Sequence, residues 1–555
     1  MTNTNPARGM RDFLPAQIRR REYVIGIIKE VYESYGFEPL ETPAVENLET
    51  LTGKYGEEGN QLIYKILKRG EKLEQSRSEN ELSDLALRYD LTVPLARVVA
   101  NHKNDLPKLF KRYQIQPVWR ADRPARGRYR EFYQCDVDAI GSSSMIVEAE
   151  LCAAVSEIME RLGFDNFVIR VNHRKLLVEL LDAAGVSSDK YIDALVALDK
   201  LDKIGREGVT KEFLQRGVSQ NSAEKLLVFF ESLVESDIKN VLGKSSTKKL
   251  IELQKQITEK EKAISDAREK AEVGYKLSLD LRSETEKLVK KLSEENSPIN
   301  TDNLQKSTSI IVESTKQIKQ LVNYMRNLTM LKGLLGFLLK NTDDEDYNSE
   351  GISSLTKFFS TFESTHITTK SLILEPASER IIIDPSLARG LSYYTGAIFE
   401  INVPDLAGSL GGGGRYDGLI GMFGKEQIPA CGFSLGLERI LVVMEERGMF
   451  PKELETNSAD VLITIWNEES IGESLKLAGE LRQRELRVLV YPEADKLGKQ
   501  FKYADSIKIP FVCVLGETEL AENKVTLKNM RTGEQETVLR EDVVSKLKDL
   551  PLQNK

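Results

Sequence analysis

Residues 120–138 (RADRPARGRYREFYQCDVD) hold side chains that could bind a phosphorylated ligand. Five arginines fall within eleven positions and are followed at once by Phe132, Gln134 and Asp138. A guanidinium group suits phosphate because its planar fork donates two parallel hydrogen bonds and stays charged at any working pH. An aromatic ring beside it can stack on a nucleobase, and carboxylates further along would hold a cationic or hydrogen-bond-donating substrate. The alternative is the charged solvent face of an ordinary hairpin, but five arginines with almost no lysine favour a ligand site.

Two strands are needed to position these side chains. Along residues 128–138, and along the preceding KRYQIQPVWR, side chains alternate between two faces with a period of two. The face with the polar groups holds Arg128, Arg130, Phe132, Gln134, Asp136 and Asp138 on one strand, and Gln114, Gln116, Val118 and Arg120 on the other. The mostly apolar face holds Tyr129, Glu131, Tyr133, Cys135 and Val137, and likewise Tyr113, Ile115, Pro117 and Trp119. The pattern predicts an antiparallel hairpin with a long basic loop, its apolar face buried in a core.

The commoner phosphate-binding loops are missing from the sequence. There is no GxxxxGK[ST], because GMFGKE lacks the first glycine and the hydroxyl residue, and GGGGRYDG does not satisfy GxGxxG. A nucleotide site would therefore have to be built on antiparallel strands.

Composition limits the class of protein. The chain has 555 residues, a formal net charge of -8, 41% hydrophobic and 30% charged residues, which predicts a globular protein of about three or four domains. It contains no run of eighteen apolar residues, and its first residues lack the apolar core of a signal peptide. Four cysteines without a CxxC pair indicate a reducing, cytoplasmic setting, and with only three histidines we expect no metal held by His or Cys. An acidic pI does not exclude nucleic acid, because binding needs only a local basic surface.

Changes in residue composition and periodicity along the chain predict its domains. Residues 1–173 and 371–452 mix helix with strands and are expected to form one core, split by a helical segment at 174–370. Residues 457–555 alternate strands and helices, which predicts a small, mostly parallel α/β sheet. Within residues 247–340 two helices with a coiled-coil-like apolar stripe suggest an antiparallel hairpin. It is either a structural insertion with a solvated charged face or a contact for a partner or RNA.

Several segments, in the right order, resemble the motifs of one family. Residues 120–138 look like motif 2 of class II aminoacyl-tRNA synthetases, in the form used by the histidyl enzymes. The other matching segments are YGFEPLETPAVE (35–46, motif 1), LRYDLTVPLARVVA (87–100, the amino-acid-binding loop), LARGLSYYTGAIFE (387–400, the histidyl signature), GGGGRYDGL (411–419) and GFSLGLERI (432–440, motif 3). The likeness covers residues 6–173 and 380–553. It implies a multidomain α+β and α/β fold: a class II antiparallel-sheet catalytic core, a helical insertion domain and a C-terminal α/β anticodon-binding domain.

The resemblance also implies how ATP is bound. Arg120 should contact the α-phosphate and the substrate carboxylate, and Phe132 should stack on adenine. Arg439 should lie on the other side of adenine or reach the γ-phosphate, although a surface salt bridge on a helix is the alternative. Asp122 and Arg128 should help to fix the bent triphosphate, with Mg²⁺ bound mainly through the phosphates.

Arg389 should be the main catalytic residue, with Arg120. It is expected to neutralise charge at the α-phosphate as the histidine carboxylate attacks, and to contact histidine. In RGLSYYTG this chain has Ser392 where family members commonly carry Asp, which puts fine substrate affinity in doubt more than the reaction type.

For histidine the resemblance implies a second set of contacts. Asp90, Thr92 and the Leu91 backbone should hold the α-amino group together with Gln134, unless Asp90 and Thr92 serve only as a helix N-cap. The imidazole should lie between Asp138 and Tyr394, with Tyr393 beside them, whereas core packing is the alternative for the tyrosines. Because neighbours in a strand point to opposite faces, at most one of Tyr393 and Tyr394 is expected to touch the ring.

The implied activity is formation of histidyl-adenylate from L-histidine and ATP, followed by transfer to the 3′ end of tRNA-His. Arg123 and Arg126 should contact the acceptor end, and motif 1 should form a homodimer. The alternative is a regulatory paralogue of histidine biosynthesis, of a type that usually lacks the C-terminal domain that is present here. A coiled-coil scaffold would explain only residues 247–340.

Overall fold

The computed structural model gives a chain of two compact units. The first comprises Met1–Phe13 and Arg21–Met449, and the second Leu14–Arg20 and Phe450–Lys555. The expected helical hairpin within 247–340 lies, apart from residues 330 and 334, outside the described residues, as do Arg389 and Ser392. The structure describes residues 3–52, 61–76, 78, 81–198, 200–234, 330, 334, 349–365, 380–388, 393–424, 426–455 and 459–549.

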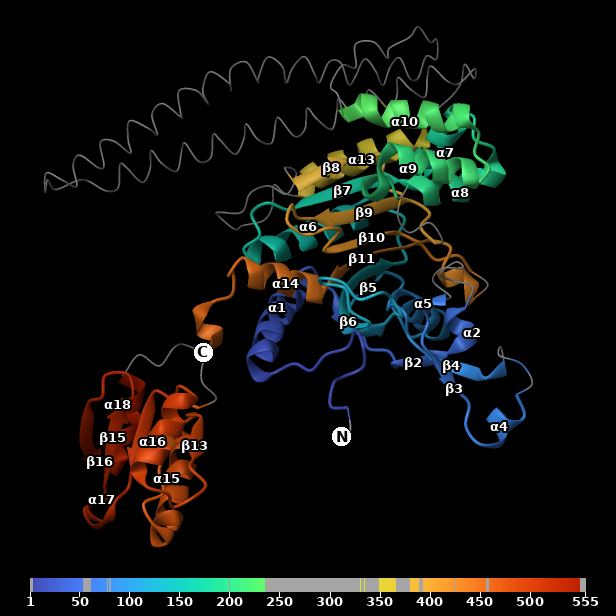
Figure 1. Ribbon diagram of the computed structural model, residues 1–555. Helices are drawn as coiled ribbons and strands as arrows, with labels where there is room; N and C mark the ends of the chain where they lie inside the picture. The colour runs from blue at the N-terminus through green and yellow to red at the C-terminus, as the bar shows by residue number, and fades with distance from the viewer. Residues whose placement is uncertain are drawn as a thin grey trace, which may run out of the picture. The chain divides into compact units, whose positions relative to one another are not determined.

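An eight-stranded sheet forms the centre of the first unit (Figure 1). Its inner strands pair antiparallel, and only the edge pairs β1–β5 and β7–β8 are parallel. The expected antiparallel core is therefore confirmed. In spatial order the strands are β1 (Glu38–Pro39), β5 (Phe110–Trp119), β6 (Glu131–Ile140), β11 (Ala430–Gly436), β10 (Gly411–Arg415), β9 (Ala397–Asn402), β7 (Val168–His173) and β8 (Ile381–Ile383).

The predicted hairpin is the pair β5–β6. Its register places Arg112 opposite Asp138 and Val118 opposite Phe132. The alternation is wrong for residues 128–130, however, because β6 begins only at Glu131 and the residues before it belong to the loop. Tyr129, expected on the apolar face, therefore lies on the same side as Arg128.

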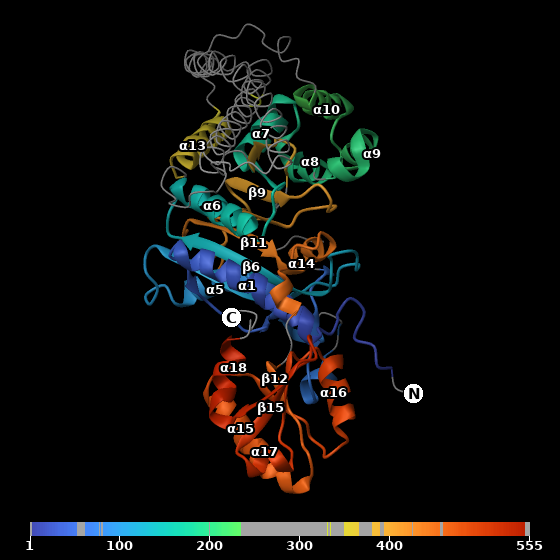
Figure 2. The same cartoon turned by 90° about the vertical axis from the view of Figure 1, so that its left-hand side faces the viewer.

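Helix α1 (Pro15–Ser34) covers the apolar face of the hairpin. Its buried side chains Val24, Ile28 and Val31 recur at helical spacing, and a proline fits its first turn because that N–H needs no partner there. The Tyr32 hydroxyl donates to the Cys135 carbonyl at 3.3 Å, which fixes the helix against β6. Figure 2 shows α1 lying beside β6. This packing leaves the polar face of the hairpin for the other side of the sheet.

Further helices complete the first unit. Helix α6 (Ile146–Arg161) is buried on nearly every side, since it packs on β11 and β6 and is covered by α13 (Glu350–Thr365). Helix α14 (Leu437–Glu446) follows β11 directly and packs on β6. The described part of 174–370 is helical: α7 (Arg174–Ala183), α8 (Tyr191–Leu198), α9 (Leu201–Gln215) and α10 (Gln220–Val234), besides α13.

A small three-stranded sheet supports the segment before helix α5. Apolar side chains of α5, among them Val93, Leu95 and Ala96, share a core with Leu51 and Tyr416. That core fixes Asp90 and Thr92 at the start of α5. The elements are β2 (Val45–Asn47), α2 (Leu48–Leu51), β3 (Lys65–Leu67), α4 (Glu71–Glu74), β4 (Ser83–Leu87) and α5 (Thr92–Asn101), with strand order β2-β4-β3.

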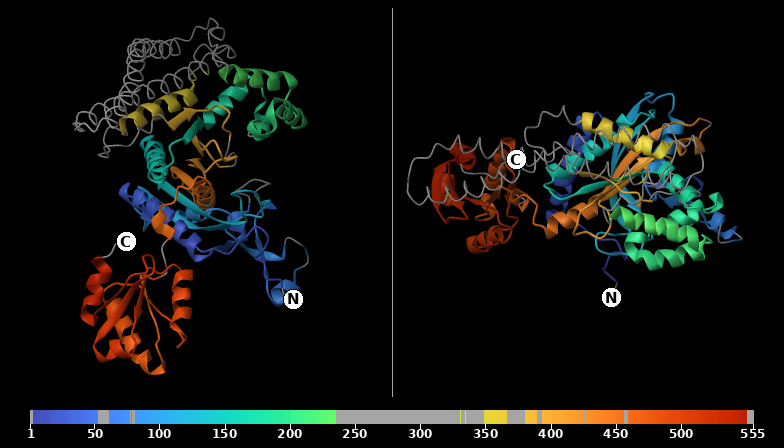
Figure 3. Two further views of the ribbon diagram at one scale, coloured as in Figure 1. Left: turned by 60° about the vertical axis from the view of Figure 1, so that its left-hand side comes forward. Right: turned by 90° about the horizontal axis from the view of Figure 1, so that it is seen from above.

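The second unit is a five-stranded sheet with helices on both sides (Figure 3). Val461 and Ile463 face a core shared with α15 and α18, whereas Leu462 faces the core beside α16, as period-two alternation requires. The expected mostly parallel sheet is only half right, because β14–β15 and β15–β16 pair antiparallel. The elements are β12 (Val461–Ile463), α15 (Ile471–Gln483), β13 (Val488–Val490), α16 (Leu497–Ser506), β14 (Phe511–Val514), α17 (Glu517–Ala521), β15 (Lys524–Asn529), β16 (Gln535–Leu539) and α18 (Val543–Asp549).

Candidate active site

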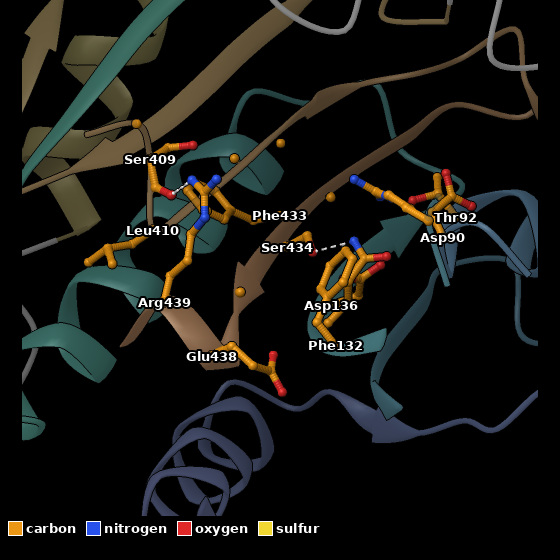
Figure 4. Close-up of a pocket in the computed structure, with 18 of the residues that line it drawn as sticks. Asp90, Thr92, Phe132, Asp136, Ser409, Leu410, Phe433, Ser434, Glu438 and Arg439 are labelled. Atoms are coloured by element: carbon orange, nitrogen blue, oxygen red, sulfur yellow. Dashed lines mark hydrogen bonds between the residues drawn. The ribbon is translucent and has the colours of Figure 1, made fainter. Parts of the chain in front are cut away.

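A cavity of about 590 Å³ opens over the polar face of β6, between β10, β11 and the first turn of α14. Figure 4 shows Ser409 and Arg439 at one end and Asp90 and Thr92 at the other. Most of the residues predicted for ligand binding line it: Asp90, Thr92, Arg120, Asp122, Arg128, Phe132, Gln134, Asp138, Tyr393, Tyr394 and Arg439. Residues more than 300 positions apart in the chain thus meet in one site.

The first end of the cavity, here called the carboxylate end, is built around one buried guanidinium group. Arg112 Nη2 lies 2.9 Å from Asp138 Oδ2 and 4.0 Å from Asp136 Oδ2, and all three side chains are buried. The Tyr416 hydroxyl donates to Asp138 Oδ1. Only glycine fits at 432, because a Cβ there would come within 1.9 Å of that same oxygen. Asp138 is therefore held from three directions.

The charges at the carboxylate end do not balance. One guanidinium faces two carboxyl groups, all three side chains being almost fully buried, and burial raises the pKa of Asp136 to about 7 although Arg112 lowers it. Burial also raises the pKa of Asp138, against the effect of Arg112. Within the described residues, no hydrogen bond is made to the buried oxygens Asp136 Oδ1 and Gln134 Oε1. The end is suited to a ligand that brings N–H donors or positive charge.

Asp90 has two roles at the edge of this end. Its Oδ1 accepts from the Val93 N–H at 3.0 Å, so it satisfies a donor in the first turn of α5, much as the alternative interpretation expected, although the N-cap position is Leu91. It also lines the cavity beside Thr92. Gln134 is oriented by Ser434, whose Oγ accepts from Gln134 Nε2 at 2.8 Å.

Tyr393 and Tyr394 correct one expectation. They precede β9 rather than lying in a strand, so the alternation argument does not apply, and both line the cavity. Their rings meet edge to face with centroids 4.7 Å apart. A Cβ at Gly414 would come within 3.1 Å of the Tyr394 ring, which shows how closely the glycine strand β10 packs against it.

The other end of the cavity, here called the arginine end, holds the motif 2 side chains. The Arg120 guanidinium lies over the Phe132 ring at 5.2 Å and over Tyr89 at 4.3 Å, while its Nε donates to the Tyr89 carbonyl at 3.0 Å. Asp122 pairs with Arg128 at 2.7 Å. This end offers permanent positive charge beside an aromatic face, which suits a nucleotide.

Arg439 closes the arginine end from α14. Its Nη1 donates to the Ser409 carbonyl, and its side chain points into the cavity rather than along the helix surface. The Arg439 guanidinium therefore lines the cavity, whereas the alternative interpretation placed it in a salt bridge on the helix surface.

Three predicted residues are not among the described residues that line the cavity. Leu91 is fully buried, and its carbonyl accepts from Arg112 Nη2 at 3.4 Å. Arg123 is exposed on the motif 2 loop. Arg126 pairs with Glu446 and donates to the Asp405 carbonyl at 3.1 Å.

Four residues that shape the site were not predicted from the sequence. They are Arg112, Tyr416, Glu438 and Asp136, which was placed on the polar strand face without a role. Arg112 shares its strand face with Gln114 and Gln116, so continuing the alternation by two residues would have found it. No local pattern indicates Tyr416, because its contact with Asp138 spans 278 positions.

Comparisons with known proteins find similar sequences and structures over nearly the whole chain. The family model for histidyl-tRNA synthetase matches residues 9–294 and 298–440, and that for an anticodon-binding domain matches 460–550. The histidine–tRNA ligase of Christiangramia forsetii is 35% identical over 541 residues, 95% of each chain, and that of Porphyromonas gingivalis is 37% identical over 544 residues, again 95% of each. The crystal structure of histidyl-tRNA synthetase from Nostoc sp. PCC 7120 is 28% identical with a TM-score of 0.62, covering 99% of this chain and 100% of that one.

Proposed function

The chain belongs to the histidyl-tRNA synthetase family, and we propose that the cavity over β6 is its active site. The protein is an ATP-dependent class II histidine–tRNA ligase, which makes histidyl-adenylate and transfers the histidyl group to the 3′ end of tRNA-His. One observation supports the location above all others. An arginine end suited to bind a nucleotide and a carboxylate end suited to bind a hydrogen-bond donor or cation share a single cavity.

Histidine binds at the carboxylate end in this proposal. Asp138, fixed by Arg112 and Tyr416, accepts a hydrogen bond from one imidazole N–H. Tyr394 meets the ring from the other side, and Tyr393 supports it. A site that leaves buried oxygens unpaired when the ligand lacks those donors selects strongly against other amino acids.

The α-amino group is held at the edge of the same end. Asp90, Thr92, the Leu91 backbone and Gln134 take this role, with Arg120 and Arg389 on the carboxylate. Because one guanidinium offsets one carboxylate and burial raises the pKa of Asp136 to about 7, Asp136 is partly protonated near neutral pH, and a ligand with positive charge favours its ionised form.

ATP binds at the arginine end. Phe132 stacks on adenine, Arg439 lies on its other side or reaches the γ-phosphate, and Asp122 with Arg128 fixes the triphosphate. Arg120 bridges the α-phosphate and the histidine carboxylate, which holds the reacting groups together.

The chemical step needs no protein base, because the histidine carboxylate is already ionised near pH 7. Its oxygen attacks the α-phosphorus, the bond to the β-phosphate breaks, and pyrophosphate leaves. Arg120 and Arg389 stabilise the charge that develops on the α-phosphate.

Mg²⁺ enters with the nucleotide in this account. The described residues contain no group of three or more His, Cys, Asp or Glu side chains suited to a metal ion, and Asp122 is already paired with Arg128. The residues present therefore fit an ion held mainly by phosphate oxygens, whose charge helps the leaving group depart.

The remaining partners are proposals of the same account. The second unit binds the tRNA anticodon, and Arg123 and Arg126 contact the acceptor end; much of this affinity is electrostatic and falls with salt. The core is the split segment 1–173 and 371–452, with 174–370 as an insertion domain and 457–555 as the anticodon-binding domain. A homodimer through residues 35–46 and a cytoplasmic location complete it, in keeping with four cysteines that are free and buried. No helix within the described parts of the chain is long and apolar enough to cross a membrane.

Amino-acid-dependent exchange between ATP and labelled pyrophosphate tests the assignment. We expect exchange with histidine and background values with the other amino acids, together with charging of tRNA-His. Deleting residues 459–555 should spare exchange and abolish charging. Absence of both reactions in the full chain would support the regulatory paralogue instead.

A further inference from the structure

Beside the arginine end lies a column of alternating cations and aromatic rings, to which the resemblance in motifs 2 and 3 assigns no role. The Arg11 guanidinium lies 4.0 Å from the Tyr129 ring and 4.6 Å from the Phe13 ring. The Arg21 guanidinium lies 4.2 Å from the centroid of the same Phe13 ring and 4.8 Å from that of the Tyr133 ring. We call Tyr129, Arg11, Phe13, Arg21 and Tyr133 the ladder.

Both ends of the ladder are anchored by polar contacts. Arg11 Nη1 donates to the Tyr129 hydroxyl at 3.0 Å. Arg21 Nη1 pairs with Glu438 Oε1 at 2.8 Å, with both side chains buried, and Glu438 Oε2 accepts from the Tyr133 N–H at 2.9 Å. Charged hydrogen bonds of this kind are among the strongest in proteins, so they hold the side chains at both ends of the ladder in place.

The N-terminal arm, residues 8–13, also grips the base of the motif 2 loop. The Arg130 N–H donates to the Gly9 carbonyl at 2.8 Å, and Arg130 Nε donates to the Asp122 carbonyl at 3.0 Å. Gly9 has a φ of 84°, and a Cβ there would come within 2.8 Å of Arg130 and 2.9 Å of Pro124. The arm and the loop are thus in direct contact along their backbones.

Three ladder contacts are immediate sequence neighbours of residues assigned to ATP. Tyr129 follows Arg128, Tyr133 follows Phe132, and Glu438 precedes Arg439. Tyr133 points to the opposite side of β6 from Phe132, so its contacts restrain that strand from behind. Tyr129 and Glu438 restrain the backbone from which the neighbouring Arg128 and Arg439 side chains project. The three ATP contacts arise from two distant segments of the chain, and the ladder joins them.

We propose that the ladder positions the ATP-binding side chains, with Arg11, Phe13 and Arg21 as positioning residues that do not touch the nucleotide. The inference rests on the proposed assignment of the arginine end to ATP. Loss of the ladder should loosen Phe132, Arg128 and Arg439 together while leaving the carboxylate end intact, since no ladder residue belongs to that end.

The test replaces Phe13, the central ring, with leucine, which keeps apolar volume but removes the π-face between two cations. In pyrophosphate exchange, Phe13→Leu should raise the KM for ATP about fivefold and leave the KM for histidine and the melting temperature near wild type. Phe13→Tyr keeps the ring and should restore the KM for ATP. Arg20→Ala is the matched control, because Arg20 lies beside Arg21 on α1 but places its guanidinium over Phe450 at 5.1 Å.

Each outcome decides the proposal. An unchanged KM for ATP in Phe13→Leu, or equal rises for ATP and histidine, would overturn it. If Phe13→Leu does not fold, Arg11→Met gives the same test, since it removes one cation from two rings and the hydrogen bond to Tyr129. Failure of the wild-type enzyme to exchange would instead contradict the proposed function, so the two failures are distinguishable.

Discussion

In our proposal, the two ends of the cavity bind their ligands by opposite electrostatic means. The arginine end uses cations that stay charged at any working pH, arranged beside an aromatic ring and braced from behind by the ladder. The carboxylate end uses two buried acids around one guanidinium, and burial raises the pKa of both acids. The comparison shows how one cavity can combine permanent positive charge for phosphate with acids whose ionisation responds to a positively charged ligand.

Removing Asp138 should produce the largest difference between the two ends. Asp138→Ala takes away the acceptor proposed for the imidazole N–H and leaves Arg112 buried without its closest carboxyl group. We expect the KM for histidine to rise about a hundredfold, with a much smaller change in the KM for ATP, measured by pyrophosphate exchange. Asp138→Asn, which keeps the shape, controls for loss of folding. Equal rises in both constants would show that the two ends are not separate.

Phe132 offers the reciprocal experiment at the arginine end. Phe132→Ala should raise the KM for ATP about tenfold, because stacking of one base on an aromatic ring contributes about 1–3 kcal/mol. The KM for histidine should change little. Phe132→Tyr, which keeps the aromatic ring in β6, serves as the comparison and should stay near wild type. If Phe132→Ala alters histidine binding as much as ATP binding, the assignment of the ring to adenine is wrong.

Asp136 sharpens the contrast through pH. Burial raises its pKa from 3.8 to about 7, so the neutral form contributes stability below about pH 4 that is lost as the pH rises through about 7. The α-ammonium group of histidine favours the ionised form of Asp136, and histidine should therefore bind more tightly at pH 8 than at pH 6, by about fivefold.

The matched variant is Asp136→Asn, assayed in the same buffers so that titration of free histidine is common to both proteins. The variant should lose most of this pH dependence and gain melting temperature relative to wild type between pH 6 and pH 8. Parallel pH profiles for the two proteins would contradict a proton held on Asp136. The KM for ATP should show no such difference between them.

The smallest effect is expected outside the cavity. The exposed pair Arg126–Glu446 contributes little to stability. Arg126→Ala should raise the KM for tRNA about twofold at low salt and leave pyrophosphate exchange unchanged. Glu446→Ala frees the guanidinium and should not weaken charging. A loss of exchange in Arg126→Ala would move this residue into the adenylation site.

Much of the fold and of the arginine end was predictable from local pattern. Period-two alternation found Phe132, Gln134 and Asp138 because strand side chains repeat every second residue, and the β5–β6 hairpin confirms it. The same rule failed at Tyr129, where the loop precedes the strand, and at Tyr393 and Tyr394, which lie before β9. Periodicity gives no signal for where a strand begins.

The carboxylate end could not be predicted in the same way. Arg112 looks like a surface cation in sequence, and only the fold shows that it is fully buried between two acids. Tyr416 and Glu438 act through contacts that span hundreds of residues. Tertiary packing brings such side chains to their partners, and the neighbouring residues in the sequence do not indicate which partners these are.

A crystal structure with bound L-histidine and a non-hydrolysable ATP analogue tests the central claim most directly. Our account predicts adenine on the Phe132 ring, the triphosphate beside Arg128 and Arg439, and an imidazole N–H directed at Asp138. Histidine density away from Asp138 and Asp136, or adenine that makes no contact with Phe132, would contradict it.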